Sequence, residues 1–148
     1  MKTIDICNRQ VVTVLADSTL ADVARLMRKN HVGAVVVVDG SDSRKPLGIV
    51  TDRDIVIEVV AQGQAASTLK AGEVMSESLA TTKSDDDVSW ALKIMRDHGV
   101  RRLPVVDGRG AMVGIVALDD LLRFYASLLN DVAQTLGTER IVEGALRA

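Results

Sequence analysis

The residues best suited to ligand chemistry stand at one predicted strand-to-helix turn, in the stretch Gly48-Ile49-Val50-Thr51-Asp52-Arg53-Asp54. Thr51 and Asp54 lie three positions apart, ahead of an apolar run. This is the spacing of a capping box, in which two side chains satisfy free N–H groups at a helix N-terminus. The same carboxylate can also accept hydrogen bonds from the adjacent hydroxyls of a ribose. The turn by itself leaves both interpretations open.

A second copy of this turn lies further along the chain and is incomplete. It reads Gly114-Ile115-Val116-Ala117-Leu118-Asp119-Asp120, so that Ala117 stands where the hydroxyl should be, while the Gly and Asp120 recur. Losing one hydroxyl hydrogen bond costs on the order of 1 kcal/mol. We therefore expect one good site, with the second site weaker or vacant.

Both turns belong to a repeat that covers most of the 148 residues. Asp39 and Asp107 are 68 positions apart, and Gly48 and Gly114 are 66 positions apart. A period this long, present only twice, indicates paired modules, because a solenoid needs several short repeats to close its core.

Each repeat has the predicted order strand, helix, strand, strand, helix. Apolar residues at helical spacing predict helices that begin near Leu20 and Val88, and β-branched runs indicate buried strands at 34–38 and 103–106. The other expected elements are strands at 11–14, 47–50, 79–82 and 112–116, helices at 52–62 and 119–129, and a helical turn at 70–75. A half-buried sheet in so small a unit leaves apolar surface exposed, so the two units should pack on each other.

The predicted domain boundaries follow from this order. We place the first repeat at residues 5–62, a linker at 63–72, the second repeat at 73–130 and a C-terminal helical tail at 131–148. The tail keeps some helical periodicity in its apolar residues, and we expect Gly137 to break it.

Composition limits the classes of function. The net charge is −2, with acidic and basic residues interspersed, whereas nonspecific nucleic-acid binding needs a basic surface. Only one Phe, one Tyr and one Trp are present, too few to stack the bases of a single strand. No apolar run approaches the ~20 residues that span a bilayer, and the N-terminus lacks the apolar core of a signal peptide. Because Cys7 is the only cysteine, we expect no internal disulfide and a cytoplasmic protein.

Other reactive side chains lack a supporting arrangement. One cysteine and two distant histidines, His31 and His98, provide no ligand set for a metal. No nucleophile, base and acid stand in a pattern that supports catalysis, so we expect neither a metal site nor an enzyme. Trp90 takes the place of Asp22 of the first repeat. The Trp90 ring either belongs to a contact surface or is only half covered at the edge of a helix, and the sequence leaves both interpretations open.

In combination, these motifs resemble a tandem pair of cystathionine β-synthase (CBS) domains, also called a Bateman module. The resemblance covers about residues 5–130 and rests on Val12-Thr13-Val14, a helix ending in Met-Arg, a strand ending in Val-Asp, and the Gly-Ile-Val-Thr-Asp-Arg-Asp turn. None of these motifs is specific for the family by itself, but their order, repeated twice, is highly specific. It implies a mixed α+β (α/β) fold of two β-α-β-β-α repeats, packed through their sheets with pseudo-twofold symmetry. It also implies clefts for adenosine-containing ligands such as AMP, ADP, ATP or S-adenosylmethionine, with no cofactor required.

The resemblance assigns residues to these clefts. The ribose would be held by Thr51 and Asp54 in the first cleft and by Asp120 in the second. The base pocket would be lined by Thr13, Val32, Gly33 and Ile49, and in the second copy by Thr81, Val100 and Ile115. The phosphate candidates are Arg101 and Arg102, followed by Arg53. For the arginine pair, two solvated side chains at a strand entrance stay the alternative interpretation.

Two hypotheses of different classes follow. The first is a regulatory module that binds an adenosine-containing ligand between its repeats and passes the occupancy to an effector protein that the sequence does not name. The second is a ligand-free homodimeric scaffold or interaction module, in which Thr51 and Asp54 serve only as a cap. The resemblance implies a homodimer built from helices 52–62 and 119–129, so we expect a dimer in either case.

Overall fold

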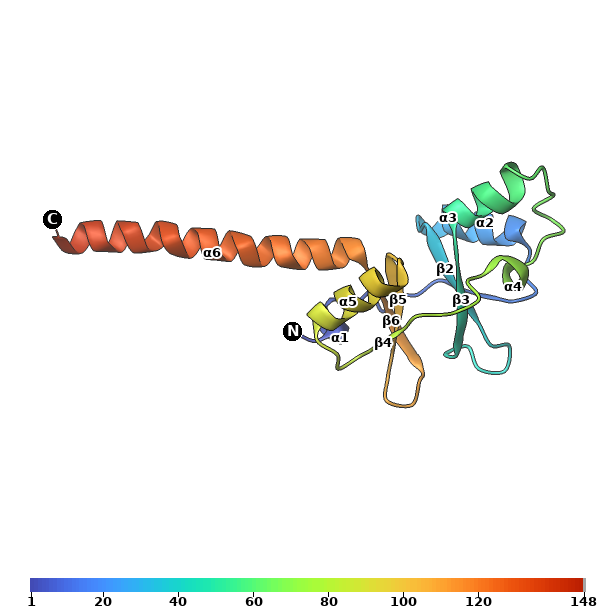
Figure 1. Ribbon diagram of the computed structural model, residues 1–148, viewed down its shortest axis with the longest axis horizontal. Coiled ribbons are helices and arrows are strands. Elements are labelled where there is room, and N and C mark those ends of the chain that lie inside the picture. The colour runs from blue at the N-terminus through green and yellow to red at the C-terminus, as the bar shows by residue number, and fades with distance from the viewer. Residues whose placement is uncertain (148) are drawn as a thin grey trace.

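Two three-stranded sheets form the body of the molecule in the computed structural model, which describes residues 1–147 (Figure 1). In each sheet the first strand is parallel to the central strand and the third is antiparallel to it. The strands of module 1 are β1 (Thr13–Leu15), β2 (Ala34–Val38) and β3 (Pro46–Thr51), and those of module 2 are β4 (Thr82–Lys83), β5 (Arg102–Val106) and β6 (Met112–Ala117). The predicted mixed α+β fold with two equivalent repeats is confirmed.

The helices follow the same repeat. They are α1 (Thr3–Ile6), α2 (Leu20–Asn30), α3 (Asp52–Ile55), the π-helix η1 (Val56–Val60), α4 (Ala71–Val74), α5 (Val88–His98) and α6 (Leu118–Arg147). The longer module helices begin at side-chain caps, where Thr19 accepts from the N–H of Asp22 and Asp87 accepts from that of Ser89. α5 ends at Gly99, whose φ of 64° suits a residue without a Cβ.

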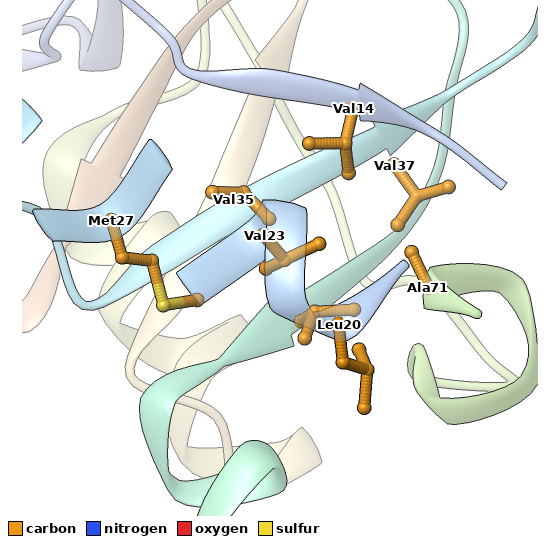
Figure 2. Close-up of a cluster of buried hydrophobic side chains, with 8 residues drawn as sticks. Val14, Leu20, Val23, Met27, Val35, Val37 and Ala71 are labelled. Atoms are coloured by element: carbon orange, nitrogen blue, oxygen red, sulfur yellow. The ribbon is translucent and has the colours of Figure 1, made fainter. Parts of the chain in front are cut away.

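Each module buries an aliphatic core between its sheet and its first helix. Figure 2 shows the core of module 1, which draws on α2, β1, β2 and α4 through Leu20, Val23, Met27, Val14, Val35, Val37 and Ala71. Val36 points to the opposite face of β2 and is also fully buried, so the central strand is covered on both sides. This explains the unbroken β-branched run, which is typical of strands without a solvent face.

The segment ahead of each repeat packs on the opposite module. Asn8, just after α1, exchanges backbone hydrogen bonds of 2.8 and 2.9 Å with Ile115 of β6. Ser76, just after α4, donates its N–H to the carbonyl oxygen of Ile49 in β3 at 3.1 Å. The two halves are therefore joined by a reciprocal exchange of leading segments, which gives the molecule its pseudo-twofold symmetry. The predicted domain boundaries stay a prediction, to which these contacts add that α1 lies on module 2.

Two glycines make the close approach of these segments possible. A Cβ built on Gly114 would lie 2.6 Å from Cys7 Sγ and 3.0 Å from the carbonyl oxygen of Asn8. A Cβ on Gly48 would lie 2.7 Å from Met75 Sδ. Because these separations are shorter than van der Waals contact, each strand needs glycine where the exchanged segment crosses it.

Cys7 should be poorly reactive in the folded chain. Its Sγ donates to the carbonyl oxygen of Ile4 at 3.6 Å, and burial raises the pKa of the thiol above its ordinary value. At pH 8 we expect iodoacetamide to modify Cys7 at least about tenfold more slowly in the folded protein than in urea, because access and thiolate fraction are both reduced. Mass spectrometry of timed samples measures the two rates. Equal rates would show that the segment around α1 is not seated on module 2.

The leading strand of module 2 is shorter and later than predicted, Thr82–Lys83 instead of 79–82. In module 1 the N–H of Val36 donates to the carbonyl oxygen of Val12 at 3.0 Å. Pro104 takes the equivalent position in β5 and has no N–H, so this ladder bond cannot form with Ala80. Pairing in module 2 therefore begins later along the chain.

The predicted helix at 52–62 is divided into α3 and the π-helix η1. The N–H of Ala61 donates to the carbonyl oxygen of Val56, five residues back, at 2.9 Å. The helix that follows β6 is instead a regular α-helix at its start. The two repeats thus differ in the type of helix that follows the strand-to-helix turn, a π-helix in the first and an α-helix in the second.

The predicted break of the C-terminal tail at Gly137 is wrong. α6 runs without interruption for 30 residues, from Leu118 to Arg147. A single glycine costs a helix about 1 kcal/mol relative to alanine but keeps its N–H in the hydrogen-bond ladder, and Leu136, Glu139 and Arg140 nearby are good helix formers. Among residues 1–147, no helix combines the length and the apolar character needed to cross a membrane.

Candidate ligand-binding site

The turn after β3 forms a complete capping box. The N–H of Asp54 donates to Thr51 Oγ1 at 3.2 Å, and the N–H of Thr51 donates to Asp54 Oδ2 at 2.7 Å. Within residues 1–147 these two side chains make no other hydrogen bond or ion pair, so Asp54 Oδ1 and the hydroxyl hydrogen of Thr51 are unused. A carboxylate offers about four lone-pair directions. Capping the helix and holding a ligand are therefore compatible.

A cavity of about 500 Å³ opens at this turn and is lined by both modules. Its walls come from the end of β3 and the start of α3, from the segment between α4 and β4, and from the turn between α5 and β5. The lining residues are Ile49, Thr51, Asp52, Arg53, Asp54, Ser76, Ser78, Leu79, Ala80, Gly99, Val100, Arg101 and Arg102. This volume is in the range of pockets that hold small molecules.

The exchanged segment explains why both repeats meet here. Ser76 is fixed to β3 twice, since its N–H donates to the Ile49 carbonyl oxygen and its Oγ accepts from the Ile49 N–H, both at 3.1 Å. The chain then continues along the end of β3 toward β4. As a result, the cavity beside the turn that carries Thr51 and Asp54 is closed by residues of the second repeat.

Three arginines and two aspartates line the cavity. Arg102 reaches across to module 1, where a Cβ on Gly33 would lie 3.6 Å from its Nη2 and 3.0 Å from Asp52 Oδ2. Within residues 1–147, Arg102 makes no ion pair of 4.0 Å or shorter. Arg101 Nη2 lies 3.8 Å from Asp119 Oδ1 in an exposed pair, which holds it only weakly. The guanidinium groups are therefore free to meet an anion.

The cavity also exposes unpaired main-chain groups. Within residues 1–147, the backbone N–H and C=O groups of Ser78, Leu79 and Ala80 make no hydrogen bond. The absence of an N–H on Pro104 leaves Ala80 without the strand partner that Val12 has in module 1. Ser78 is exposed and Leu79 and Ala80 are half-buried, so these main-chain groups are open to water and accessible to a ligand with donors and acceptors on its edge.

Some of the sequence-predicted residues line the cavity and the others lie outside it. The cavity brings together Thr51, Asp54, Ile49 and Arg53 of the first repeat with Val100, Arg101 and Arg102 of the second. The predicted residues that do not line it are Thr13, Val32, Gly33, Thr81, Ile115 and Asp120. The lining residues missed by sequence reasoning are Asp52, Ser76, Ser78, Leu79, Ala80 and Gly99. Three of these, Asp52, Ala80 and Gly99, are direct neighbours of predicted residues in the sequence, and this adjacency is the one sequence signal that could have indicated them.

The equivalent turn of module 2 has only half of the cap. Asp120 Oδ2 accepts from the N–H of Ala117 at 2.9 Å, and Ala117 has no hydroxyl to return the bond. Arg123 Nη1 lies 3.7 Å from Asp120 Oδ1. Both oxygens of this carboxylate thus have partners, unlike those of Asp54.

Comparison with known families decides the identity of the fold. The family model for the CBS domain matches residues 4–61 and again residues 71–127. The chain belongs to the CBS domain family. The two matched stretches make it a CBS pair, as the sequence motifs predicted.

Similar proteins support the pairing. The CBS domain-containing protein YhcV of Bacillus subtilis (strain 168) is 39% identical over 117 residues, which cover 79% of this chain and 80% of that protein. Among solved structures, the CBS domain protein PAE2072 from Pyrobaculum aerophilum complexed with AMP is similar with a TM-score of 0.79 and 29% identity, covering 90% of this chain and 99% of that one. The CBS domain pair of MJ0100, in complex with 5′-methylthioadenosine and S-adenosyl-L-methionine, is similar in fold at a TM-score of 0.75 and 24% identity, covering 86% of this chain and 97% of that one.

Two other relatives are longer than this chain. The chain is 36% identical over 132 residues, 89% of its length, to the protein MK0525 of Methanopyrus kandleri, and it spans 66% of that relative. It spans 52% of the mitochondrial CBS domain-containing protein CBSX3 of Arabidopsis thaliana, with 33% identity over 109 residues, 72% of this chain. The chain thus spans about half to two thirds of these relatives. Within residues 1–147, no cluster of three or more His, Cys, Asp or Glu is arranged to hold a metal ion.

Proposed function

We propose that this CBS pair is a regulatory module that binds one adenosine-containing ligand in the cavity between its repeats, without catalysis. The observation that carries the proposal is the meeting of a complete Thr51–Asp54 pair from one repeat with Arg101 and Arg102 from the other. PAE2072, which is similar over nearly its whole length, is complexed with AMP, and this supports the same class of ligand.

The ribose would bind at the turn after β3. Asp54 Oδ1 accepts from the 2′- and 3′-hydroxyls, while the Thr51 hydroxyl donates to one of them. Hydrogen bonds to a charged group contribute about 1.5–3 kcal/mol each, so this carboxylate would supply much of the affinity. The cap holds both side chains in place before the ligand arrives, which lowers the entropic cost of binding.

The adenine would lie against the aliphatic wall formed by Ile49, Leu79 and Val100. Its edge carries both an amino donor and ring-nitrogen acceptors, and the unpaired main-chain groups of residues 78–80 offer partners for each. An aliphatic slot with backbone partners suits a flat, neutral base and explains how a chain with few aromatic residues can bind one.

The phosphate of a nucleotide would point toward Arg102, with Arg101 and Arg53 nearby. We expect Arg102→Ala to weaken AMP binding about tenfold or more while leaving adenosine binding within about twofold, because only AMP carries the anion that the guanidinium binds. Arg123→Ala, on α6 and outside the cavity, is the matched control and should change neither value. Isothermal titration of both ligands measures the effect. An equal loss for adenosine would mean that Arg102 serves the structure and not the phosphate.

The proposal is tested by titrating the full chain with AMP, ATP and S-adenosylmethionine. At least one should bind with one molecule per chain, and it should raise the midpoint of thermal unfolding as its concentration increases. Binding of none of the three would contradict the proposal. For a signal to pass to an effector protein, the ligand must bind one relative packing of the two modules better than another.

A homodimeric scaffold is the second candidate, and the exposed helices after the two turns favour a dimer. Val56 and Val60 on η1 are 56% and 71% exposed, and Leu122 on α6 is 67% exposed. Large apolar side chains this exposed on a helix are typical of a surface that another subunit covers. We propose a homodimer built through helices 52–62 and 119–129 whether or not the cavity is filled, together with a separate effector protein and a cytoplasmic location.

A further inference from the structure

Helix α6 leaves the body of the molecule and exposes much of its apolar surface. Figure 1 shows it extending away from both modules, and its 30 residues correspond to about 45 Å at 1.5 Å per residue. Only Leu121 is buried, and all residues from 126 to 147 are exposed. A single helix in water is marginally stable, and large exposed aliphatic side chains on it indicate that a partner covers them.

Most of the uncovered apolar residues near the start and middle of α6 follow one line, and Leu128, which is 45% exposed, lies beside it. Leu122, Tyr125, Leu129, Val132 and Leu136 are spaced three and four apart, and we call this line the seam. The exposed fractions of Leu122, Leu129, Val132 and Leu136 are 67%, 71%, 59% and 58%, while Tyr125 is partly covered. Alternating steps of three and four are the heptad pattern by which two helices pack side by side. The seam therefore fits another helix with the same pattern.

We propose that the seam binds the seam of a second copy of this chain, with the two α6 helices antiparallel. The inference shares helix 119–129 with the proposed homodimer but replaces its contact through η1. In an antiparallel pair, Leu118 of each copy lies beside Glu143 of the other, 25 positions or about 37 Å along α6, so the two modules stand apart and their η1 helices do not meet. A second copy is the partner because an isologous pair needs one self-complementary surface, which the seam provides.

Charge decides the direction. The seam continues at its C-terminal end into Glu139 and Glu143, at the next heptad positions. In a parallel pair each glutamate would face its own copy inside the contact, and like charges there are repelled and desolvated. In an antiparallel pair with Leu129 opposite Val132 of the second copy, Glu139 and Glu143 face Leu122 and Leu118 at the two ends of the contact and do not face each other.

The antiparallel register also pairs the flanking residues. Tyr125 faces Leu136 of the second copy, and Ala126 comes beside Ala133, which lets the helices approach closely. Arg140 comes beside Asp119 of the other copy, a pairing of opposite charges. Asp119 is 67% exposed beside Arg101 and so has room for a second partner.

Disulfide trapping in the full chain tests the direction, with Cys7→Ser as background. Leu122 and Glu139 are 17 positions apart, about 25 Å along a helix, far beyond the reach of a disulfide. We expect the double variant Leu122→Cys with Glu139→Cys to give a disulfide-linked dimer on mild oxidation, and each single variant to give none. A linked dimer from Leu122→Cys alone would show a parallel pair and overturn the proposal. A dimer that none of the variants traps would overturn it as well.

Dissociation of the dimer tests the contact itself. Leu129→Glu should weaken the dimer on the order of 100-fold or more, because it places a charge in the seam of both copies. Ile141→Glu, at a residue 74% exposed on another face of α6, is the matched control and should leave the dimer unchanged. Analytical ultracentrifugation measures both. If Leu129→Glu leaves a wild-type dimer, the α6 contact is refuted while the homodimer through η1 stands; a monomeric wild-type chain refutes both. AMP titration of the same variants reports separately on the ligand site.

Discussion

Asp54→Ala should weaken AMP binding by about 30- to 1,000-fold, which corresponds to about 2–4 kcal/mol. The variant removes the carboxylate that accepts from the ribose hydroxyls, and no other lining acid lies at the same position of the helix cap. It also removes the hydrogen bond from the N–H of Thr51 to Asp54 Oδ2, so the free energy of unfolding should fall by about 1 kcal/mol. Isothermal titration and urea unfolding measure the two effects.

Asp120→Ala is the control that separates binding from capping. Asp120 caps the start of α6 as Asp54 caps α3, accepting from the N–H of Ala117 at 2.9 Å. The control should therefore lose a similar amount of stability, about 1 kcal/mol, and keep its affinity for AMP within about twofold. The repeat thus offers two chemically identical substitutions with different predicted effects on the ligand.

The scaffold hypothesis makes the opposite prediction for the same pair. If Thr51 and Asp54 serve only as a cap, both alanine variants lose stability alike, and no nucleotide raises the unfolding midpoint of the wild-type chain. Equal AMP affinity in the wild type and in Asp54→Ala would likewise refute the proposed ribose contact.

Gly114→Val should lower the free energy of unfolding by about 2–4 kcal/mol. The new side chain would begin 2.6 Å from Cys7 Sγ and 3.0 Å from the Asn8 carbonyl oxygen, so the exchanged N-terminal segment must move off β6. Gly40→Val is the control, because a Cβ there meets nothing within 4 Å. Urea unfolding followed by circular dichroism compares the two.

A second substitution identifies the cause of that loss. Cys7→Ala removes the sulfur at 2.6 Å and leaves only the Cβ of that residue, 3.4 Å from the place that a Cβ on Gly114 would take. In the Gly114→Val background it should therefore restore part of the stability, whereas in the wild type it should cost some. If the two effects simply add, the clash with Cys7 is not the reason for the destabilisation.

The elements and the chemistry of the site were largely predictable from local patterns. The helical spacing after Leu20 and Val88, the β-branched run of β2 and the Thr51–Asp54 spacing each depend on residues close together in the chain. The same is true of the missing hydroxyl at Ala117. Signals of this kind survive folding because neighbouring residues fix them.

What sequence reasoning could not supply are the contacts between distant segments. The bonds between Asn8 and Ile115 and between Ser76 and Ile49 decide that the ribose turn of one repeat meets the arginines of the other. No local pattern encodes that exchange. Pro104 shortens β4 only through its pairing with a strand more than 20 residues away, and Gly137 is tolerated because the residues around it favour a helix.

The most direct test is a crystal structure of the full chain grown with saturating AMP. We predict one nucleotide per chain, with its ribose hydroxyls within hydrogen-bond distance of the Asp54 carboxylate and its phosphate at Arg102. A nucleotide bound instead around Asp120, or held by residues of a single repeat, would contradict the claim that one repeat holds the ribose while the other holds the phosphate.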